Sequence, residues 1–260
     1  MLYAYLNLWR YSMAYPRFYQ ASSITLNDTI ELSEDVFAHA IRVLRLTMND
    51  FIMLFNGELM NNQHFDYLAQ FSQINKKTAQ VKIIEQIPVA NESPLNIHLG
   101  QGISRGDRMD FTLQKSVELG VHKITPLFTE RCGVKLSGER LIKKQQQWQK
   151  IVYSACEQSG RAFIPEVAEP MLLADWLTEQ TTALKLNLHP KAQHSIMSLP
   201  AQTDKVRLLI GPEGGLSDDE ISQANQANFQ DVLLGPRILR TETAALTAIS
   251  ALQCRYGDLA

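Results

Sequence analysis

Two glycine-rich turns near the C-terminus carry residue types suited to binding a small molecule. The first is Ile210-Gly-Pro-Glu-Gly-Gly215, and the second begins Leu234-Gly-Pro-Arg-Ile-Leu-Arg240. Each turn follows an apolar run that predicts a buried strand, and each leads into a helix-like stretch. In α/β sheets, turns at the carboxyl ends of strands form the crevice that binds ligands. The two turns therefore predict a ligand site at one edge of a sheet.

The first turn limits which ligand can bind there. Its glycines let a ligand approach the backbone, but it lacks both the Gly-x-Gly-x-x-Gly and the Gly-Lys-Ser/Thr patterns of phosphate cradles. Glu213 would also repel a phosphate, so a neutral or cationic ligand fits better. The alternative is that Glu213 is merely a solvent-facing acid in a turn. Further along, Ser217 and Glu220 match a capping box, which predicts a helix start without implying any function.

The second turn places two arginines, Arg237 and Arg240, just before an apolar helix. Thr241 or Thr243 could cap that helix. Capping does not explain the arginines, because the dipole at a helix N-terminus favours anions over cations. We therefore expect these arginines to bind a phosphate or to orient a carboxylate.

The elements that must position these turns alternate between strand and helix. Apolar runs predict strands at 95–99, 124–128, 184–188, 206–210 and 232–234, and helical spacing predicts helices at 107–119 and 138–159. Asp107 can cap the first of these helices, and Gly120 and Gly160 can end them. This alternation predicts a mainly parallel sheet covered by helices on both faces.

In the earlier part of the chain, the apolar residues have a different spacing. Alternating apolar residues predict strands over 51–55, 65–71 and 79–84, with a hairpin signal at Asn56-Gly57 and a turn at 75–78. A helix is expected over 34–46. Short strands with one helix indicate a small barrel-like domain over residues 13–87. Prolines and polar residues mark a linker at 88–94, and the α/β domain follows over 95–260. Residues 1–12 do not resemble a secretory signal, and we expect a misassigned start or a disordered extension.

The amino-acid composition limits the classes of protein to which this chain can belong. The 260 residues are 45% hydrophobic and 20% charged, as in a soluble globular protein. No apolar run is as long as a membrane span. Three cysteines without C-x-x-C spacing indicate a cytoplasmic protein, and the scattered histidines predict no metal site. The net charge of −2 argues against a general nucleic-acid coat. A local basic face between Arg131 and Lys150 is compatible with RNA binding or with a merely solvated surface.

The two turns resemble the signature of the SPOUT methyltransferase superfamily, and specifically its 16S ribosomal RNA uridine-N3 methyltransferase branch. The match covers residues 211–215 and 234–243. It continues through nearly all of the chain after Met13, in a series of co-linear motifs at 16–18, 39–45, 114–120, 129–132, 148–151 and 157–161.

The resemblance implies a fold, a cofactor and partners. The fold would be an α/β SPOUT domain with a C-terminal trefoil knot, preceded by a PUA-like β-barrel that binds RNA. S-adenosylmethionine would be the methyl donor, the protein would form a homodimer through the knot, and 16S ribosomal RNA in an assembled small subunit would be the partner. The reaction would be methylation of N3 of one uridine. Arginine is absent from residues 186–190, which favours a base over a ribose target. Two alternatives stay open: a SPOUT enzyme acting on another base or on ribose, and a non-catalytic assembly factor.

The resemblance also assigns residues to roles. Glu242 is the first candidate for the base that removes the uracil N3 proton, Glu213 is the second, and Arg240 would stabilise the resulting negative charge. The donor pocket would be formed by three loops, comprising Leu188, His189, Pro190, Ile210, Gly211, Pro212, Glu213, Gly214, Gly215, Leu234, Gly235, Ile238, Leu239 and Arg240. RNA contacts are expected from Arg17, Arg42, Arg45, Arg131, Arg161 and Arg237. For Lys115, Glu118, Arg131, Glu157 and Arg161, the alternative is a role in helix-surface ion pairs and caps.

Overall fold

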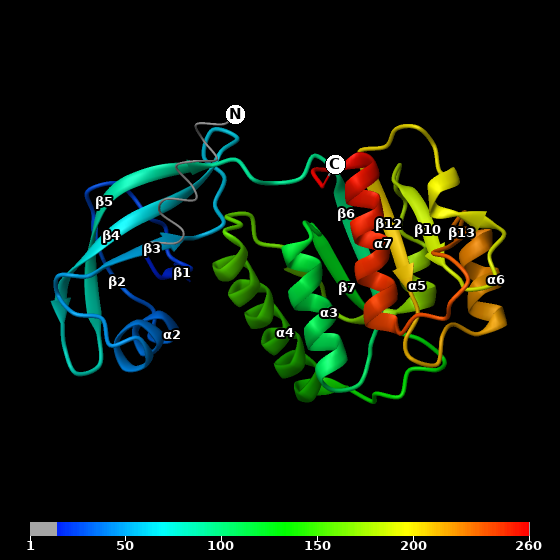
Figure 1. The fold of residues 1–260 in the computed structure, drawn as a ribbon. Coiled ribbons are helices and arrows are strands. Elements are labelled where there is room, and N and C mark those ends of the chain that lie inside the picture. The colour runs from blue at the N-terminus through cyan, green and yellow to red at the C-terminus, as the bar shows by residue number, and fades with distance from the viewer. Residues whose placement is uncertain (1–14, 260) are drawn as a thin grey trace. The chain divides into compact units, whose positions relative to one another are not determined.

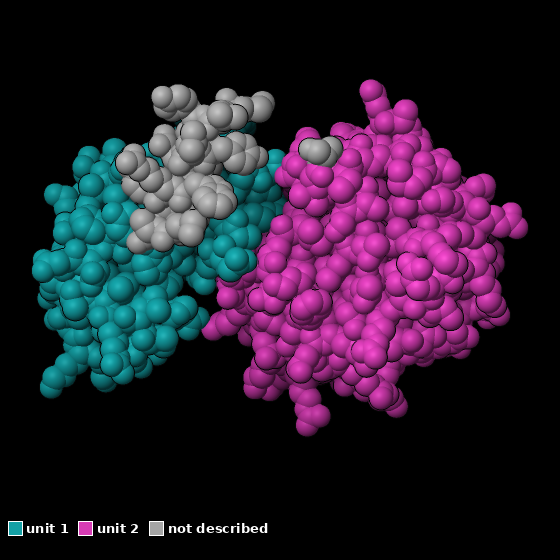
Figure 2. All heavy atoms as spheres, in the orientation of Figure 1, with its two compact units in different colours: residues 1–92, 156–164 teal, residues 93–155, 165–260 magenta. Residues whose placement is uncertain are grey.

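The computed structural model describes residues 15–259, which divide into two compact units. Unit 1 comprises residues up to Glu92 together with Cys156–Ile164, and unit 2 comprises Ser93–Ala155 and the chain from Pro165 onward (Figure 2). The predicted extension, residues 1–12, lies outside the described residues. None of the helices in the described part is both long and apolar enough to cross a membrane.

Unit 1 is built on a five-stranded sheet in the order β1-β3-β4-β5-β2 (Figure 1). Its two edge strands are linked through the side chain of Gln20, whose Nε2 donates to the Glu31 carbonyl at 3.2 Å and whose Oε1 accepts from the Ser33 N–H at 3.0 Å. This link connects the two edge strands, as expected of the small barrel-like domain that the alternation predicted. The strands are β1 (Arg17–Tyr19), β2 (Thr29–Glu31), β3 (Phe51–Phe55), β4 (His64–Ile74) and β5 (Ala79–Val89).

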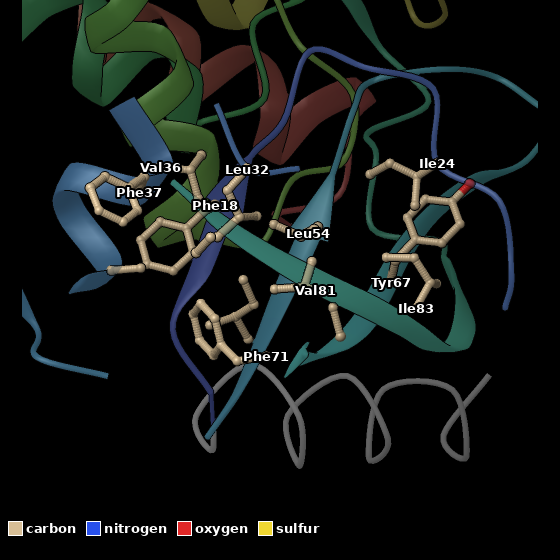
Figure 3. Packing of buried hydrophobic residues seen from close by; sticks show 14 residues of the cluster. Phe18, Ile24, Leu32, Val36, Phe37, Leu54, Tyr67, Phe71, Val81 and Ile83 are labelled. Atoms are coloured by element: carbon tan, nitrogen blue, oxygen red, sulfur yellow. The ribbon is translucent and has the colours of Figure 1, made fainter. Parts of the chain in front are cut away.

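The core of unit 1 follows from the alternation along these strands. One face of β3, β4 and β5 sends apolar side chains inward, where they pack against Phe18 and against the helical segment that follows Ser33 (Figure 3). That segment is a short α2 (Glu34–Phe37) continued by a π-helix, η1 (Ala38–Val43), in place of the regular helix predicted over 34–46. The wider turn shows in the bond from the Leu44 N–H to the His39 carbonyl.

The two predicted turns of this sheet differ in outcome. The turn at 75–78 closes the β4–β5 hairpin, with the Asn75 N–H donating to the Thr78 carbonyl at 2.8 Å. Asn56-Gly57 does not close a two-residue hairpin, because β3 ends at Phe55 and β4 begins at His64. The Asn56 side chain instead accepts from the Glu58 N–H at 3.1 Å and forms a local turn within a longer loop.

Unit 2 contains the parallel sheet that the strand–helix alternation predicted. Its strand order is β11-β13-β10-β12-β6-β7-β8, with β9 also paired to β7, and every pairing is parallel. The chain inserts β12 between β6 and β10, and then β13 between β10 and β11. The strands are β6 (Asn96–Gly102), β7 (Lys123–Phe128), β8 (Glu166–Val167), β9 (Met171–Leu172), β10 (Leu184–Leu188), β11 (His194–Ser195), β12 (Lys205–Ile210) and β13 (Gln230–Leu233).

Helices cover both faces of this sheet. Helix α3 (Asp107–Glu118) lies beside α7 (Thr241–Tyr256), in front of the sheet in Figure 1. Apolar residues of α5 (Leu173–Leu177) and α6 (Asp218–Gln226) pack together with Leu127 and Leu209 of the sheet in a separate core cluster. The remaining helices are α4 (Gly138–Ser159), with the predicted bounds, and the 3-10 turn η2 (Ile196–Ser198).

Helix α6 begins with the predicted capping box of Ser217 and Glu220. Helix α3 differs from expectation, because Gly106, at φ +56°, precedes it as the N-cap and Asp107 is its first residue.

Candidate functional site

A cavity of about 540 Å³ opens where β10, β12 and β13 end. These three strands are neighbours in the sheet because of the insertion order described above, so the loops that follow them converge. The volume is in the range of sites for small molecules and cofactors. The cavity is lined by residues 187–191, 210–216 and 233–235, by 237–241, and by Arg108, Arg131, Asp218, Ile221 and Ala244.

The structure brings together all the residues that the sequence assigned to a donor pocket. Each of them lies on the wall of this one cavity: Leu188, His189, Pro190, Ile210, Gly211, Pro212, Glu213, Gly214, Gly215, Leu234, Gly235, Ile238, Leu239 and Arg240. The cavity also includes side chains that were not predicted. Asn187 and Lys191 flank the loop at 188–190, and Arg108 comes from the segment after β6; Arg131, from the segment after β7, was predicted as an RNA contact and not as part of this pocket.

Glycines allow the first turn to lie against the sheet. A Cβ on Gly102, at the end of β6, would lie 2.5 Å from the Pro212 nitrogen, so the turn can take this position only because residue 102 has no side chain. Gly215 and Gly235 adopt left-handed backbone conformations with φ values of +67° and +91°. The role of Gly102 was not predicted, because its neighbour in space, Pro212, is more than one hundred residues away in the sequence.

Thr241 joins the two glycine-rich turns. Its hydroxyl donates to the Gly211 carbonyl at 2.6 Å and accepts from the Gln101 side chain at 2.9 Å. Capping of α7 by Thr241 or Thr243 was a wrong prediction, since the N-cap is Arg240 and no side chain caps the helix. Thr241 therefore fixes the start of α7 against the first turn.

Glu213 contacts residues well outside its own turn. Its Oε1 accepts from the Arg105 backbone N–H at 2.9 Å and from Nη1 of Arg108 at 3.2 Å. Partial burial alone would raise the pKa of Glu213, but hydrogen bonds from the backbone N–H groups of Arg105 and Glu213 and from the Arg108 guanidinium lower it. The carboxylate is therefore held ionised, which makes it a weak candidate for a base.

Glu242 lies in the first turn of α7. Its Oε2 is buried and has no hydrogen-bond partner among residues 15–259. A buried carboxylate oxygen without a partner is costly. Glu242 does not itself line the cavity, although Thr241 and Ala244 of the same helix do.

Three of the predicted RNA-contacting arginines lie at the cavity. Arg131 donates to the Gly214 and Leu216 carbonyls at 3.3 and 3.2 Å, and it remains exposed. The side chains of Arg237 and Arg240 are also exposed on the cavity wall. The cavity therefore has a cationic rim.

Two other predicted RNA contacts, Arg17 and Arg161, lie in the interior of unit 1. Arg17 is 7% exposed, pairs with Asp66 at 2.7 Å, and donates to the carbonyls of Cys156 and Arg161. Arg161 is 4% exposed and binds the Glu92 carboxylate through its Nε at 3.0 Å. This geometry favours the ion-pair interpretation over RNA contact. Lys115 and Glu118 likewise form an ion pair at 2.8 Å on α3.

Arg42 and Arg45 are exposed near the π-helix of unit 1. The Arg42 guanidinium lies 5.4 Å from the centre of the Phe37 ring. Arg45 has φ +58°, an uncommon conformation for a residue with a side chain. Between them, Val43 is 67% exposed, so this surface combines positive charge with apolar area.

Comparison with known families identifies both units. A model described as an RNA methyltransferase domain matches residues 91–253, and one described as an RNA methyltransferase PUA domain matches residues 32–84. Ribosomal RNA small subunit methyltransferase E from Buchnera aphidicola subsp. Schizaphis graminum is 41% identical over 94% of this chain and 98% of its own length. Its namesake from Bacillus subtilis is 28% identical over 86% of this chain and 89% of its own.

Two solved structures share the fold over nearly the whole chain. A methyltransferase from Legionella pneumophila, in complex with the bound cofactor SAM, is 44% identical, with a TM-score of 0.89 over 94% of this chain and 99% of that one. Ribosomal RNA small subunit methyltransferase E from Neisseria gonorrhoeae, bound to S-adenosyl methionine, is 40% identical. Its TM-score is 0.87 over 95% of this chain and 100% of that one.

Proposed function

Because the chain belongs to the ribosomal RNA small subunit methyltransferase E family, we propose that it methylates N3 of a specific uridine in 16S ribosomal RNA. The methyl donor is S-adenosylmethionine, which the Legionella and Neisseria relatives bind. The observation that carries the proposal is that both glycine-rich turns and the loop at 188–190 line one cavity.

The cavity fits the donor in size and in chemistry. Mainly backbone groups of residues 188–190, 210–215 and 234–240 would hold the donor, and the close approach at Gly102 sets the position of the first turn on the cavity wall. When bound, S-adenosylmethionine supplies an electrophilic methyl group on a sulfonium. Thr241 holds the first turn to α7, so the wall of the site is fixed before the donor binds.

Methylation of uracil at N3 requires removal of the imide proton, and we assign this step to Glu242. Its place in the first turn of α7, next to the cavity-lining Thr241, supports this role, and its Oε2 has no other hydrogen-bond partner among residues 15–259. Arg240 and Arg237 would stabilise the negative charge that spreads onto the uracil oxygens or would hold a neighbouring phosphate. Alignment of the reacting atoms supplies much of the remaining rate enhancement.

RNA binding is assigned to exposed arginines in each unit. Arg131 and Arg237 would act at the cavity, and Arg42 and Arg45 in the PUA-like unit. The target must be a splayed uridine, since N3 is inaccessible within a duplex.

The further parts of the proposal rest on the family. They are a trefoil knot at the C-terminus, a homodimer through the knot domain, and an assembled small subunit as substrate. The proposed organisation is an RNA-binding barrel over 13–87, a linker over 88–94 and a catalytic domain over 95–260, and the division of the chain after Glu92 supports a boundary in this region. We also place the protein in the cytoplasm, which its three unpaired cysteines support.

The test is methylation of free 16S RNA and of small subunits with labelled donor, followed by nucleoside analysis. The expected product is 3-methyluridine, and the preferred substrate of the two shows whether the assembled subunit is required. A 2′-O-methyl nucleoside would indicate a ribose methyltransferase instead. Donor binding without any product would indicate an assembly factor.

A further inference from the structure

The Glu213 carboxylate links two loops at the mouth of the cavity. Both of its partners, the Arg105 N–H and the Arg108 guanidinium, belong to the segment that leads from β6 into α3. Strands β6 and β12 are neighbours, so Glu213, in the loop after β12, reaches across to the loop after β6. One oxygen accepts both hydrogen bonds, and the pKa of the group is lowered. These contacts indicate that the Glu213 carboxylate holds another residue in place.

The residue held in place is Arg108. Its guanidinium lines the cavity, and its side chain is 45% exposed. Within the described part of the chain, the guanidinium makes one hydrogen bond, to Glu213. A guanidinium has five N–H donors, so most of its donors are available to a ligand.

Contacts from a third loop stiffen this arrangement. A Cβ on Gly133, in the loop after β7, would lie 2.5 Å from Nε of Arg105, so the Arg105 side chain lies directly on that loop. Arg131 of the same loop donates to the Gly214 carbonyl beside Glu213. Charged side chains therefore connect the loops after three adjacent strands, β12, β6 and β7, and Arg108 is fixed relative to the cavity.

We propose that Glu213 is a positioning residue that holds Arg108 at the cavity mouth, where Arg108 binds an anionic oxygen of the RNA substrate. This inference rests on the proposed function. The oxygen belongs to a phosphate near the target uridine, or to the uracil ring as the N3 proton leaves. Both are anionic oxygens that a guanidinium recognises.

The experiment compares the full-length wild-type protein with Glu213→Gln, Arg108→Gln and the double variant in steady-state methylation of small subunits. Arg108→Gln is expected to lower kcat/KM by about 10–100-fold, as for loss of a hydrogen bond to a charged group. Glu213→Gln alone should lower kcat/KM about tenfold. Added to Arg108→Gln, it should lower kcat/KM no further, because the two residues act as one unit. The matched control is Glu166→Gln. Glu166 pairs with Lys123 at 3.0 Å, at the opposite end of β7 from the cavity.

Kinetic parameters distinguish the two sources of the oxygen. A higher KM with unchanged kcat, and a salt dependence of binding reduced by about one unit, identifies a phosphate. A lower kcat with unchanged KM identifies the uracil.

Three results would overturn the inference: additive losses in the double variant, weaker binding of S-adenosylmethionine by Glu213→Gln, or loss of the acidic limb of its pH–rate profile. The last would make Glu213 the base. If the wild-type protein forms no 3-methyluridine at all, the proposed function itself fails, and this is seen before any variant is compared.

Discussion

The buried arginines of unit 1 and the exposed arginines at the cavity of unit 2 serve opposite purposes. In unit 1, Arg17 and Arg161 are buried and use their donors on Asp66, Glu92 and backbone carbonyls. At the cavity of unit 2, Arg237 and Arg240 are exposed, and their side chains make no hydrogen bond or ion pair within the described residues. The first pair holds the fold together, and the second is free to meet a ligand.

The difference shows that the role of an arginine depends on the hydrogen-bond and ion-pair partners of its guanidinium within the fold, and not on the residue type alone. A buried guanidinium is stable only when its charge and its donors are matched. An exposed one gains little from surface ion pairs, so it can remain unpaired at low cost until a substrate arrives. The comparison therefore predicts that substitutions of the buried arginines of unit 1 will change stability, while substitutions of the exposed arginines at the cavity will change catalysis or RNA affinity.

The largest effect on catalysis is expected from Glu242→Gln. The amide keeps the shape of the side chain but cannot accept the N3 proton, so the single-turnover rate should fall by roughly 10²–10⁴-fold. Donor affinity and the unfolding free energy should stay close to wild type. Rapid-quench methylation with saturating donor measures the rate, and full single-turnover activity in this variant would exclude Glu242 as the base.

The largest effect on stability is expected from Arg17→Met, which leaves Asp66 buried without its partner. Loss of one member of a buried pair costs about 3–5 kcal/mol. Hydrogen exchange of peptides from β1 and β3 reports the local free energy of unit 1, and protection there should fall most. The double variant Arg17→Met/Asp66→Leu should recover much of the loss, because no charge is then left unpaired.

Arg237→Met is the matched substitution at the cavity. It should leave the exchange protection of unit 1 and the unfolding free energy unchanged, since this exposed side chain has no partner among the described residues to lose. A comparable loss of stability in Arg237→Met would contradict the division between the two sets of arginines.

The sequence was sufficient to predict the central strands of unit 2, its helices α3 and α4 and the two glycine-rich turns of its site. The short elements β8, β9, β11 and α5 were not predicted, and the loop at 188–190 came only from the family resemblance. Glycines mark the ends of apolar runs there, and α4 and β10 begin and end at the predicted residues. The missing parts of the site come from distant segments. Gly102 lies against the first turn, and Arg108 reaches the cavity, only because β12 is inserted beside β6, and no local pattern encodes that strand order. The burial of Arg17 depends on Asp66, 49 residues away, and the π-helix at 38–43 depends on packing that overrides a regular helical pattern.

A moderate effect is expected from Gly102→Ala, which tests the close approach that opens the cavity. The added methyl group would overlap the Pro212 nitrogen, and accommodating it should cost about 1–3 kcal/mol, as for overpacking of a core. Affinity for S-adenosylmethionine should fall, because the first turn must move. Calorimetric titration measures the affinity. Gly100→Ala is the matched control in the same strand, since its added methyl group would overlap the Trp176 ring and not the turn, so it should cost stability without lowering the affinity for the donor.

The smallest effects concern the salt dependence of RNA binding, and they test the comparison most directly. Each phosphate contact that is removed should lower the slope of log affinity against log salt concentration by about one unit. We expect that change for Arg237→Gln in the cavity rim and for Arg42→Gln beside the π-helix, because both guanidinium groups are exposed. Arg161→Gln should leave the slope unchanged after correction for the folded fraction, because that guanidinium already neutralises Glu92 in the interior of unit 1. Fluorescence anisotropy with labelled 16S RNA fragments over a series of salt concentrations measures all three slopes. An equal decrease for Arg161→Gln would mean that the buried set also contacts RNA, and the distinction between the two regions would no longer hold.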